Sequence, residues 1–248
     1  MRILINGLCG HMGAEVAALA QKGCRSAELV AGADVNCSGL TAVPCVKDIT
    51  EAETNVDCII DFSHHTCTEA LLDFAVRNSL PLVLATTGQT EEERAAIEAA
   101  AEKIPIFFAA NYSIGIALLM ELAKKAAAVM PDAEIEIIEK HHDRKLDAPS
   151  GTALAIGEAI REVRPEATFN LGRSGQGKRT PEEIGFHAIR MGNIVGEHEV
   201  LIGTQNQTIT LKHEAYSRTL FAEGALAAAE FLCGKPAGLY NMKSLVSF

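Results

Sequence analysis

The chain has 248 residues, of which 48% are hydrophobic and 22% are charged, and its formal net charge at pH 7 is −10. These values are typical of a globular protein, and the length suffices for one large domain or two smaller ones. The acidic balance argues against a nucleic-acid partner, and no apolar run approaches the roughly 20 residues that a membrane helix needs. The first residues have the pattern of a strand rather than of a signal peptide, so we expect a cytoplasmic protein with no membrane partner.

The first part of the sequence alternates short apolar runs with helical patterns. Strands are expected over residues 2–6, 27–34, 56–62, 81–87 and 104–110, and helices over 12–22, 66–78 and 90–103. Thr90 and Glu93 form a capping box at the start of the third helix. Nearly continuous apolar strands between amphipathic helices predict an α/β fold with a parallel sheet that is covered on both faces.

The pattern changes after Asn111. Helices are expected over residues 113–130 and 152–163, and strands over 134–140, 184–190, 197–202 and 208–213, with a last helix from Ser217. Short turns with Gly or Asn between consecutive strands predict a second domain of the α+β kind, with an open mixed sheet that is mostly antiparallel. The segment 173–179, rich in glycine and arginine, is either an exposed surface loop or a loop that closes over a site.

A glycine-rich segment follows the first strand and opens the first helix, as the phosphate-binding loop of a Rossmann fold does. Its expected cofactor-binding residues are Gly7, Leu8, Cys9, Gly10, His11, Met12 and Gly13. Gly7 permits the tight turn, Gly10 lets the backbone approach a pyrophosphate, and Gly13 lets the helix pack closely on the strand. Asp34 ends the second strand, about twenty residues on, where a carboxylate can accept both ribose hydroxyls of an adenosine.

The seven cysteines form no C-x-x-C pair and no Cys/His spacing of a zinc site, so we expect reduced thiols and no metal. Cys9 differs from the others because it lies at the start of a helix. The helix dipole can lower the pKa of a thiol there, and the sequence leaves open whether Cys9 is reactive.

The segment 139–152 reads E-K-H-H-D-R-K-L-D-A-P-S-G-T and gathers cationic or proton-donating side chains in an acidic protein: His141, His142, Arg144 and Lys145. Ser150 can cap a helix that begins directly after it. A helix N-terminus presents unpaired N–H groups and the positive end of the dipole, which suits a carboxylate or a phosphate. Proton donors beside such an anion site predict an enzyme that acts on a small acid.

The pattern E-I-I-E-x-H-H-x-x-K-x-D-A-P-S-G-T-A over residues 136–153 resembles the signature of the 4-hydroxy-tetrahydrodipicolinate (dihydrodipicolinate) reductase family. The G-x-x-G-x-M-G form of the glycine loop resembles the same family. The resemblance implies NAD(P)H-dependent reduction of 4-hydroxy-tetrahydrodipicolinate to tetrahydrodipicolinate in lysine and diaminopimelate biosynthesis, by a homotetramer. It also implies a discontinuous Rossmann-like dinucleotide-binding domain, residues 1–112 and 219–248, with a substrate-binding and oligomerisation domain, residues 113–218, inserted between its parts.

The resemblance also implies roles for single residues. His141 matches the family's proton donor, a role that suits histidine because it titrates near neutrality, and Lys145 matches a second donor or charge stabiliser. The implied substrate-binding residues are His142, Ser150, Gly151, Thr152 and Arg218. For Arg218, which is expected to open the last helix, a structural salt bridge remains an equal alternative.

Two more segments resemble the nicotinamide side of the family, and both end a strand. The first is Ala85, Thr86, Thr87 and Gly88, with alanine for the family's glycine, and the second is Ala109, Ala110, Asn111 and Tyr112. Ala117 stands where the family often has asparagine, which removes one expected contact. Some members have a basic residue for the 2′-phosphate of NADP where this chain has Val35, so we expect NADH, or dual use with NADH preferred. Lys47 could substitute from the next loop.

Two other functions fit parts of the sequence. Another two-domain nicotinamide enzyme, such as an amino-acid or semialdehyde dehydrogenase, would share the glycine loop but has no reason to carry the segment 141–152. A nucleotide-sensing module without turnover would have no need of the two proton donors, His141 and Lys145.

Overall fold

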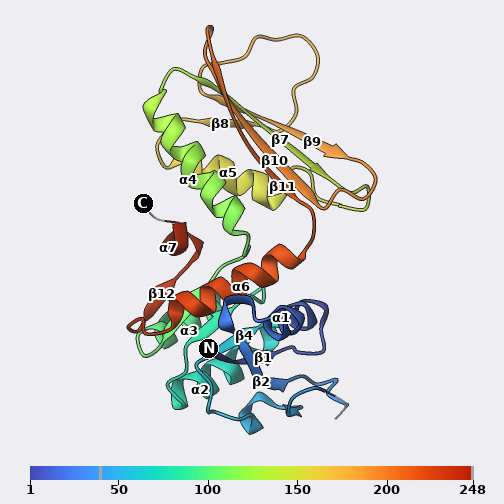
Figure 1. Ribbon diagram of the computed structural model, residues 1–248. Helices are drawn as coiled ribbons and strands as arrows, with labels where there is room; N and C mark the ends of the chain where they lie inside the picture. Colours follow the sequence, from blue (N-terminus) through green and yellow to red (C-terminus); the bar gives the residue numbers. More distant parts are fainter. Residues whose placement is uncertain (39–40, 247–248) are drawn as a thin grey trace. The chain divides into compact units, whose positions relative to one another are not determined.

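The computed structural model describes residues 1–38 and 41–246 and divides into two compact units (Figure 1). The first unit comprises Met1–Ser113 and Thr219–Leu245, and the second comprises Ile114–Arg218. The segment Ile114–Arg218 is therefore inserted between two parts of the first unit.

The first unit contains a seven-stranded parallel sheet in the order β12-β6-β5-β4-β1-β2-β3. Its strands are β1 (Arg2–Asn6), β2 (Glu28–Ala33), β3 (Cys45–Val46), β4 (Cys58–Asp61), β5 (Leu82–Leu84), β6 (Pro105–Phe108) and β12 (Gly238–Tyr240). The order of the first six is that of a doubly wound dinucleotide-binding fold, with its switch point between β1 and β4. The expected Rossmann-like α/β fold is confirmed.

Helices cover both faces of this sheet (Figure 1). On one face, α2 (Thr68–Arg77) and α3 (Glu91–Ala101) bury apolar side chains against the strands. On the other, α1 (His11–Gln21) packs against α6 (Thr219–Leu232), which lies over β4, β5 and β6. The expected capping box opens α3, since Thr90 Oγ1 accepts a bond from the Glu93 N–H (3.2 Å) and the Glu93 carboxylate accepts one from the Thr90 N–H (2.8 Å).

Three strands were not expected from the sequence: β3, β8 (Thr168–Asn170) and β12. Each has only two or three residues and lies at the edge of its sheet, so its apolar alternation is too short to recognise. The expected strands over residues 56–62 and 81–87 were too long. Phe62 and Ala85 already belong to the loops that follow β4 and β5, at the sheet edge where ligands bind in this fold.

The second unit contains a five-stranded sheet in the order β11-β10-β7-β9-β8. Its longer strands are β7 (Glu134–His141), β9 (Glu183–Arg190), β10 (Gly196–Gly203) and β11 (Thr208–Ala215). β10 runs antiparallel to β7 and β11, whereas β9 runs parallel to β7 and β8. The sheet is open and mixed as expected, but the expectation that it is mostly antiparallel is wrong. The crossover through α5 (Gly151–Arg161) returns the chain parallel to β7.

One face of this sheet packs against α4 (Ile114–Val129) and α5. The shared core includes Ile137 of β7, Phe186 of β9, Val200 of β10 and Ile156 of α5, all of them buried. The opposite face bears partly exposed side chains of both charges, among them Lys140 of β7, which pairs with Glu197 of β10 at 2.9 Å.

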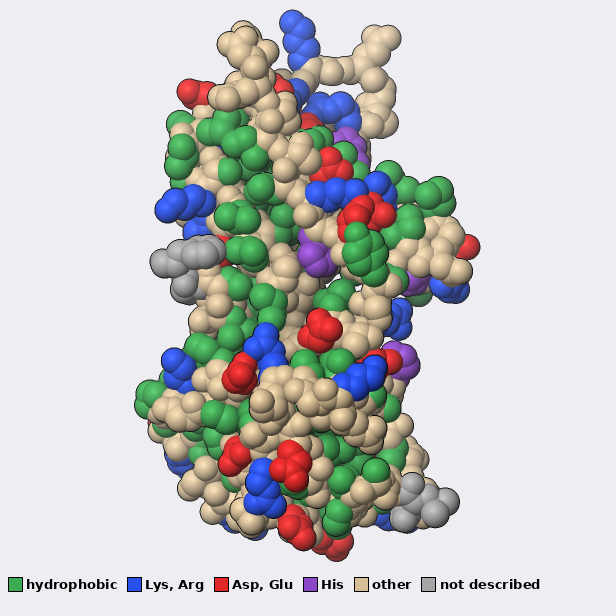
Figure 2. Space-filling model, viewed as in Figure 1, with side chains coloured by type: hydrophobic (Ala, Val, Ile, Leu, Met, Phe, Trp, Pro, Cys, Tyr) green, Lys and Arg blue, Asp and Glu red, His purple; other side chains and the backbone are tan. Residues whose placement is uncertain are grey.

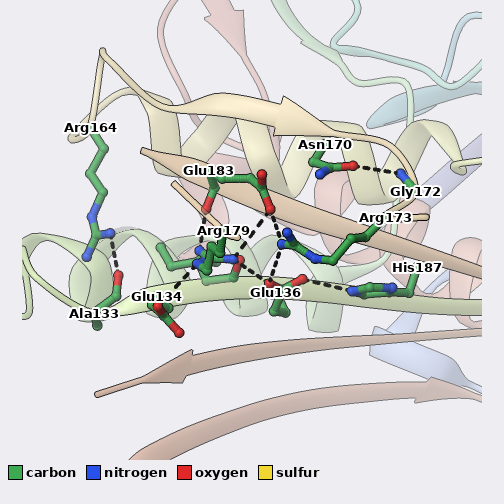
Figure 3. A network of polar contacts seen from close by, with 11 residues as sticks. Ala133, Glu134, Glu136, Arg164, Asn170, Gly172, Arg173, Arg179, Glu183 and His187 are labelled. Atoms are coloured by element: carbon green, nitrogen blue, oxygen red, sulfur yellow. Dashed lines mark hydrogen bonds and ion pairs between the residues drawn. The ribbon is translucent and has the colours of Figure 1, made fainter. Parts of the chain in front are cut away.

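Both arginines of the segment 173–179 are held by carboxylates of the same unit (Figure 3). Arg173 forms an ion pair with Glu183, and Arg179 forms one with Glu136 and also donates to the carbonyl of Ile135 at 3.3 Å. The two ends of the segment are therefore anchored to β7 and β9, and of its two expected roles these contacts favour the surface loop.

In the described part of the chain, no helix is long and apolar enough to cross a membrane. On the face shown in Figure 2, lysine and arginine side chains lie among aspartate and glutamate side chains.

Candidate active site

Polar residues of the second unit gather on the sheet face that α4 and α5 cover. Along β7 the buried isoleucines face the helices, and strand alternation places Glu139 and His141 on the same face. The strand register sets Arg190 of β9 beside His141 and His198 of β10 beside Glu139. Three neighbouring strands thus each contribute to one cluster at the start of α5.

Glu139 lies at the centre of this cluster, with 1% of its side chain exposed. Its carboxylate accepts hydrogen bonds from His141 Nδ1 (2.6 Å), from the backbone N–H of Ser150 (2.9 Å) and from both Nη atoms of Arg190 (2.8 and 2.6 Å). Burial acts to raise the pKa of Glu139, but these bonds outweigh it and hold that pKa below its ordinary value. A negative charge therefore stands directly beside the imidazole of His141.

The second ring nitrogen of His141 faces a glycine. A Cβ on Gly196 would lie 3.1 Å from His141 Nε2, closer than such contacts normally are. Since Glu139 holds Nδ1, Nε2 is the atom from which His141 can deliver a proton, and Gly196 keeps space beside it.

His198 is buried and lies between His141 and Ser150, two of the residues that the sequence places in the site. Its Nε2 is 3.1 Å from Ser150 Oγ, and its ring stands edge-on to that of His141 at a centroid distance of 5.2 Å. Burial, followed by the charge of His141, lowers the pKa of His198 to about 4. His198 is therefore neutral near pH 7, and it fixes the side chain of Ser150, the residue that caps α5 through the Ala153 N–H (3.1 Å).

The carboxylate of Asp147 lies against Lys145 and the Gly151 N–H, two donors that are expected to bind substrate. Its Oδ1 lies 2.8 Å from Lys145 Nζ. The hydrogen bond from Lys145, supplemented by the backbone N–H of Gly151, lowers the pKa of Asp147 although burial opposes it. A Cβ on Gly151 would meet no atom within 4 Å, so the space above this helix end is open. Lys145 and the first N–H of α5 together form a site for a carboxylate.

His142 lies next to this cluster, and its Nδ1 is buried without a hydrogen-bond partner among the described residues. Burial, then the charges of Arg144 and Arg218, lower the pKa of His142. Arg218, whose charge contributes to this shift, precedes α6 by one residue and does not open that helix as expected. Thr152 follows Gly151 in the first turn of α5 and is partly buried.

The glycine loop of the first unit depends on two of its glycines. Gly7 has φ +83°, and a Cβ there would lie 2.5 Å from the carbonyl oxygen of Phe62. A Cβ on Gly13 would lie 2.1 Å from the carbonyl oxygen of Gly7, so a side chain would separate α1 from β1. Gly10 caps α1 without a side-chain hydrogen bond, which leaves the first N–H groups of the helix for an anionic ligand.

A pocket of about 270 Å³ lies within the first unit. It brings together residues from three of the expected cofactor segments and two residues that the sequence analysis missed: Met12, Phe62, Ala85, Ala110, Asn111, Tyr112 and Phe221. The side chain of Met12 thus lines this pocket, in addition to the part that its backbone has in the glycine loop. Phe62 and Phe221 carry no polar signal in the sequence, and only the fold shows that they line this pocket.

Asp34 stands beside the glycine loop as expected. Its carboxylate accepts hydrogen bonds from the backbone N–H groups of Cys9 (2.9 Å) and Asn36 (2.8 Å), and the next residue, Val35, is 74% exposed. Burial and the negative charge of Asp34 raise the pKa of Cys9, the opposite of the effect that a helix dipole can have.

The side chains of several expected cofactor residues pack against other residues of the protein or form hydrogen bonds with its backbone. Leu8 is buried against Gly32, where a Cβ would lie 2.3 Å from Leu8 Cδ2. The hydroxyl group of Tyr112 lies within hydrogen-bond distance of two backbone carbonyls, those of Leu84 (2.9 Å) and Phe107 (3.1 Å), which share its one proton. Four others are at least partly exposed: His11, Thr87, Gly88 and Ala109.

A buried carboxylate also joins strand ends in the first unit. Asp61 accepts hydrogen bonds from Asn6 Nδ2 (2.8 Å), Ser63 Oγ (2.6 Å) and Thr86 Oγ1 (2.6 Å), and burial raises its pKa. The side chain of Thr86 is therefore engaged by Asp61.

The sequence analysis missed Asp61 together with Glu139, Arg190 and His198. The available signal was a polar residue on the otherwise apolar face of a strand. Within residues 1–38 and 41–246, no three His, Cys, Asp or Glu side chains are placed to hold a metal ion.

The lowered pKa of His198 predicts a pH-dependent stability. In the unfolded chain a histidine binds a proton below about pH 6.5, whereas folded His198 stays neutral down to about pH 4. The unfolding free energy should therefore fall as the pH drops from 6.5 to 4, by about 3 kcal/mol from this residue. Urea unfolding of the His198→Gln variant should show a flatter dependence between pH 6.5 and 5, and the exposed His187→Gln control should keep the wild-type slope. Equal slopes in all three proteins would contradict the assignment.

Comparisons with known proteins cover the whole chain. The family model described as "Dihydrodipicolinate reductase, N-terminus" matches residues 1–112, and "Dihydrodipicolinate reductase, C-terminus" matches residues 115–246. Proteins named 4-hydroxy-tetrahydrodipicolinate reductase are 46% identical in Caldanaerobacter subterraneus (99% of this chain, 98% of the relative) and 42% identical in Clostridium tetani (100% and 97%).

Solved structures agree with these matches. The dipicolinate-bound dihydrodipicolinate reductase from Paenisporosarcina sp. TG-14 superposes with a TM-score of 0.81 at 28% identity, covering 99% of both chains. The DAP dehydrogenase of C. glutamicum superposes with a TM-score of 0.57 at 14% identity over 98% of this chain and 92% of that one, which shows a shared fold alone. From the two family models and the full-length relatives, the chain belongs to the dihydrodipicolinate reductase family.

Proposed function

We propose that this protein reduces 4-hydroxy-tetrahydrodipicolinate to tetrahydrodipicolinate with NAD(P)H, in the biosynthesis of diaminopimelate and lysine. The observation that carries the proposal is the Glu139 cluster, which holds a histidine proton donor beside a carboxylate site at the start of α5. The relative from Paenisporosarcina binds dipicolinate, a dicarboxylate, which agrees with such a site.

Substrate binding begins with an exchange of carboxylates. Lys145 and the N–H of Gly151 hold Asp147, and a substrate carboxylate would replace it there. Asp147 is more than half exposed, so it can turn into solvent when displaced. His142 and Arg218 add donors and positive charge on the same side, with Ser150 and Thr152 framing the turn.

The proton comes from His141. The carboxylate of Glu139 holds Nδ1 and stabilises the imidazolium, so Nε2 donates to the carbon that develops negative charge as it is reduced. Lys145 stabilises the departing hydroxyl group or supplies it with a proton. Water leaves as the hydroxyl group together with a proton lost from the neighbouring ring carbon, the reduction takes up one hydride and one proton, and the nicotinamide supplies the hydride when it is bound.

The residues of the first unit fit a dinucleotide. The close approach of Gly13 to Gly7 leaves room for a pyrophosphate at the start of α1, and the pocket between Met12 and Asn111 suits an apolar ring. Asp34 would accept the ribose hydroxyls and repel a 2′-phosphate, and Val35 offers no positive charge to offset this. NADH is therefore the preferred coenzyme, unless the exposed Lys47 provides that charge.

We further propose that the protein assembles as a homotetramer through the second unit. The support is the sheet face opposite α4 and α5, where apolar residues such as Ile138 and Leu201 are only partly buried among charged neighbours. A mixed surface of this kind suits the pairing of like subunits.

The first prediction concerns the reaction. With substrate formed in situ by condensing pyruvate and aspartate semialdehyde, absorbance should report substrate-dependent oxidation of NADH, faster than that of NADPH. Bound NADH without any oxidation would favour a dehydrogenase of other specificity or a sensor. A faster reaction with NADPH would contradict the role given to Asp34 and Val35.

A second prediction concerns the proton donor. His141→Gln should lower kcat by about 10²–10⁴-fold, the usual contribution of a general acid. NADH affinity, measured by fluorescence titration, should be unchanged, because the dinucleotide residues belong to the other unit. A kcat equal to that of the wild type would refute the role of His141.

A third prediction concerns Glu139 as a positioning residue. In Glu139→Gln the imidazole of His141 loses the carboxylate that holds Nδ1, so kcat should fall by about tenfold or more while the KM for the substrate stays near the wild-type value. The matched control is Glu136→Gln on the opposite face of β7, where the carboxylate pairs with Arg179 and His187. An unchanged kcat in a folded Glu139→Gln protein would reduce Glu139 to a structural role.

A further inference from the structure

Three cysteines that are far apart in the sequence meet beside the dinucleotide loop. Cys9 lies between β1 and α1, Cys37 follows β2, and Cys45 begins β3. β1, β2 and β3 are neighbours in the parallel sheet, and Cys45 is in register with Gly32 of β2. The sheet order therefore brings together three thiols that look scattered in the sequence.

Cys45 is the central member of this thiol cluster. Its thiol forms hydrogen bonds with the thiols of both Cys37 and Cys9, and Cys37 Sγ also donates to the carbonyl oxygen of Cys45 at 3.0 Å. The cluster adjoins the expected ribose site, because the N–H of Cys9 donates to Asp34 Oδ2 at 2.9 Å. All seven cysteines of the chain are outside disulfides.

The three thiols differ in accessibility. Cys9 is exposed, whereas Cys37 and Cys45 are partly buried. An oxidant in solution reaches Cys9 first, and Cys45 is in contact to react with the product. Burial and the charge of Asp34 raise the pKa of Cys9, and burial and the contacts with Cys37 and Cys9 raise the pKa of Cys45 to about 12, so both are mostly protonated thiols at neutral pH and react slowly with a peroxide.

We propose that Cys9 and Cys45 are a modification site, at which a hydroperoxide forms a reversible disulfide that weakens dinucleotide binding. The sulfur of Cys9 attacks the peroxide, the O–O bond breaks, and Cys9 becomes a sulfenic acid as the peroxide leaves as an alcohol, or as water from hydrogen peroxide. The sulfur of Cys45 then attacks that of Cys9, the S–O bond breaks and water leaves. The two thiols lose two protons and two electrons, and the peroxide is reduced.

The effect on binding follows from the position of Cys9, and this part of the inference rests on the proposed dinucleotide function. Cys9 belongs to the loop whose backbone must face the pyrophosphate, and its N–H holds Asp34. A covalent bond to β3 would tie this loop to the edge of the sheet and place the sulfur bridge against Asp34. The loop would then lose the conformation that the ligand requires.

The test uses the full chain. Reduced protein is treated with stoichiometric hydrogen peroxide, remaining thiols are blocked with N-ethylmaleimide, and unreduced peptides are analysed by mass spectrometry. We expect a Cys9–Cys45 linked peptide, a loss of NADH affinity of about tenfold or more by fluorescence titration, and recovery of both thiols and affinity with dithiothreitol.

Variants identify the pair. Cys45→Ala should abolish the linked peptide and the dithiothreitol-reversible loss of affinity, with Cys45→Ser as a second variant should the alanine protein unfold. Cys37→Ala should keep both. The matched control is Cys24→Ala, which removes a partly buried thiol of the same unit outside the cluster and should behave as the wild type.

Two results would overturn the inference: consumption of the Cys9 thiol without a Cys9–Cys45 link, or a link that leaves NADH affinity unchanged. Failure of the proposed function is distinguishable, because reduced protein would then bind neither NADH nor NADPH while the peptide map still reports the disulfide.

Discussion

The buried carboxylate of Glu139 is the interaction on which the candidate site depends. Burying a charge costs several kcal/mol unless it is paired and hydrogen-bonded, and here Arg190, His141 and the Ser150 N–H together meet that cost. Each donor comes from a different place: β9, β7 and the start of α5. Removing the carboxylate would leave the partly buried Arg190 without its partner, so the same group joins the strands and orients the imidazole of His141.

The first unit uses a buried carboxylate differently. Asp61 receives bonds from neutral donors, Asn6, Ser63 and Thr86, and burial raises its pKa instead of being outweighed. With no cation beside it, Asp61 serves to join the ends of β1, β4 and β5, where the loops that line the pocket begin. Glu139 thus supplies a negative charge to the candidate site of the second unit, whereas Asp61 fixes the positions of the strand ends in the first unit.

The thiol cluster and the Glu139 cluster arise from the same property of sheets. Residues far apart in sequence become neighbours when their strands pair, and strand order, not chain order, decides which ones meet. Cys9, Cys37 and Cys45 meet because β1, β2 and β3 are adjacent. Glu139 and His198, about sixty residues apart, meet because β7 pairs with β10. A pattern search along the chain examines local spacing and does not detect such pairs.

The sequence by itself determined the α/β class and the family, because these rest on local periodicity and on short motifs, and it predicted roles for His141, Lys145 and Ser150 through the same motifs. It did not determine the short edge strands, the parallel pairing of β7 with β9 or the exact lining of the pocket. It also left the reactivity of Cys9 open, since the effects of burial and of Asp34, which raise the pKa of Cys9, are not local in the sequence. Only the tertiary structure decided the partners of Glu139 and the meeting of the three thiols, because long-range pairing and burial depend on the whole sheet.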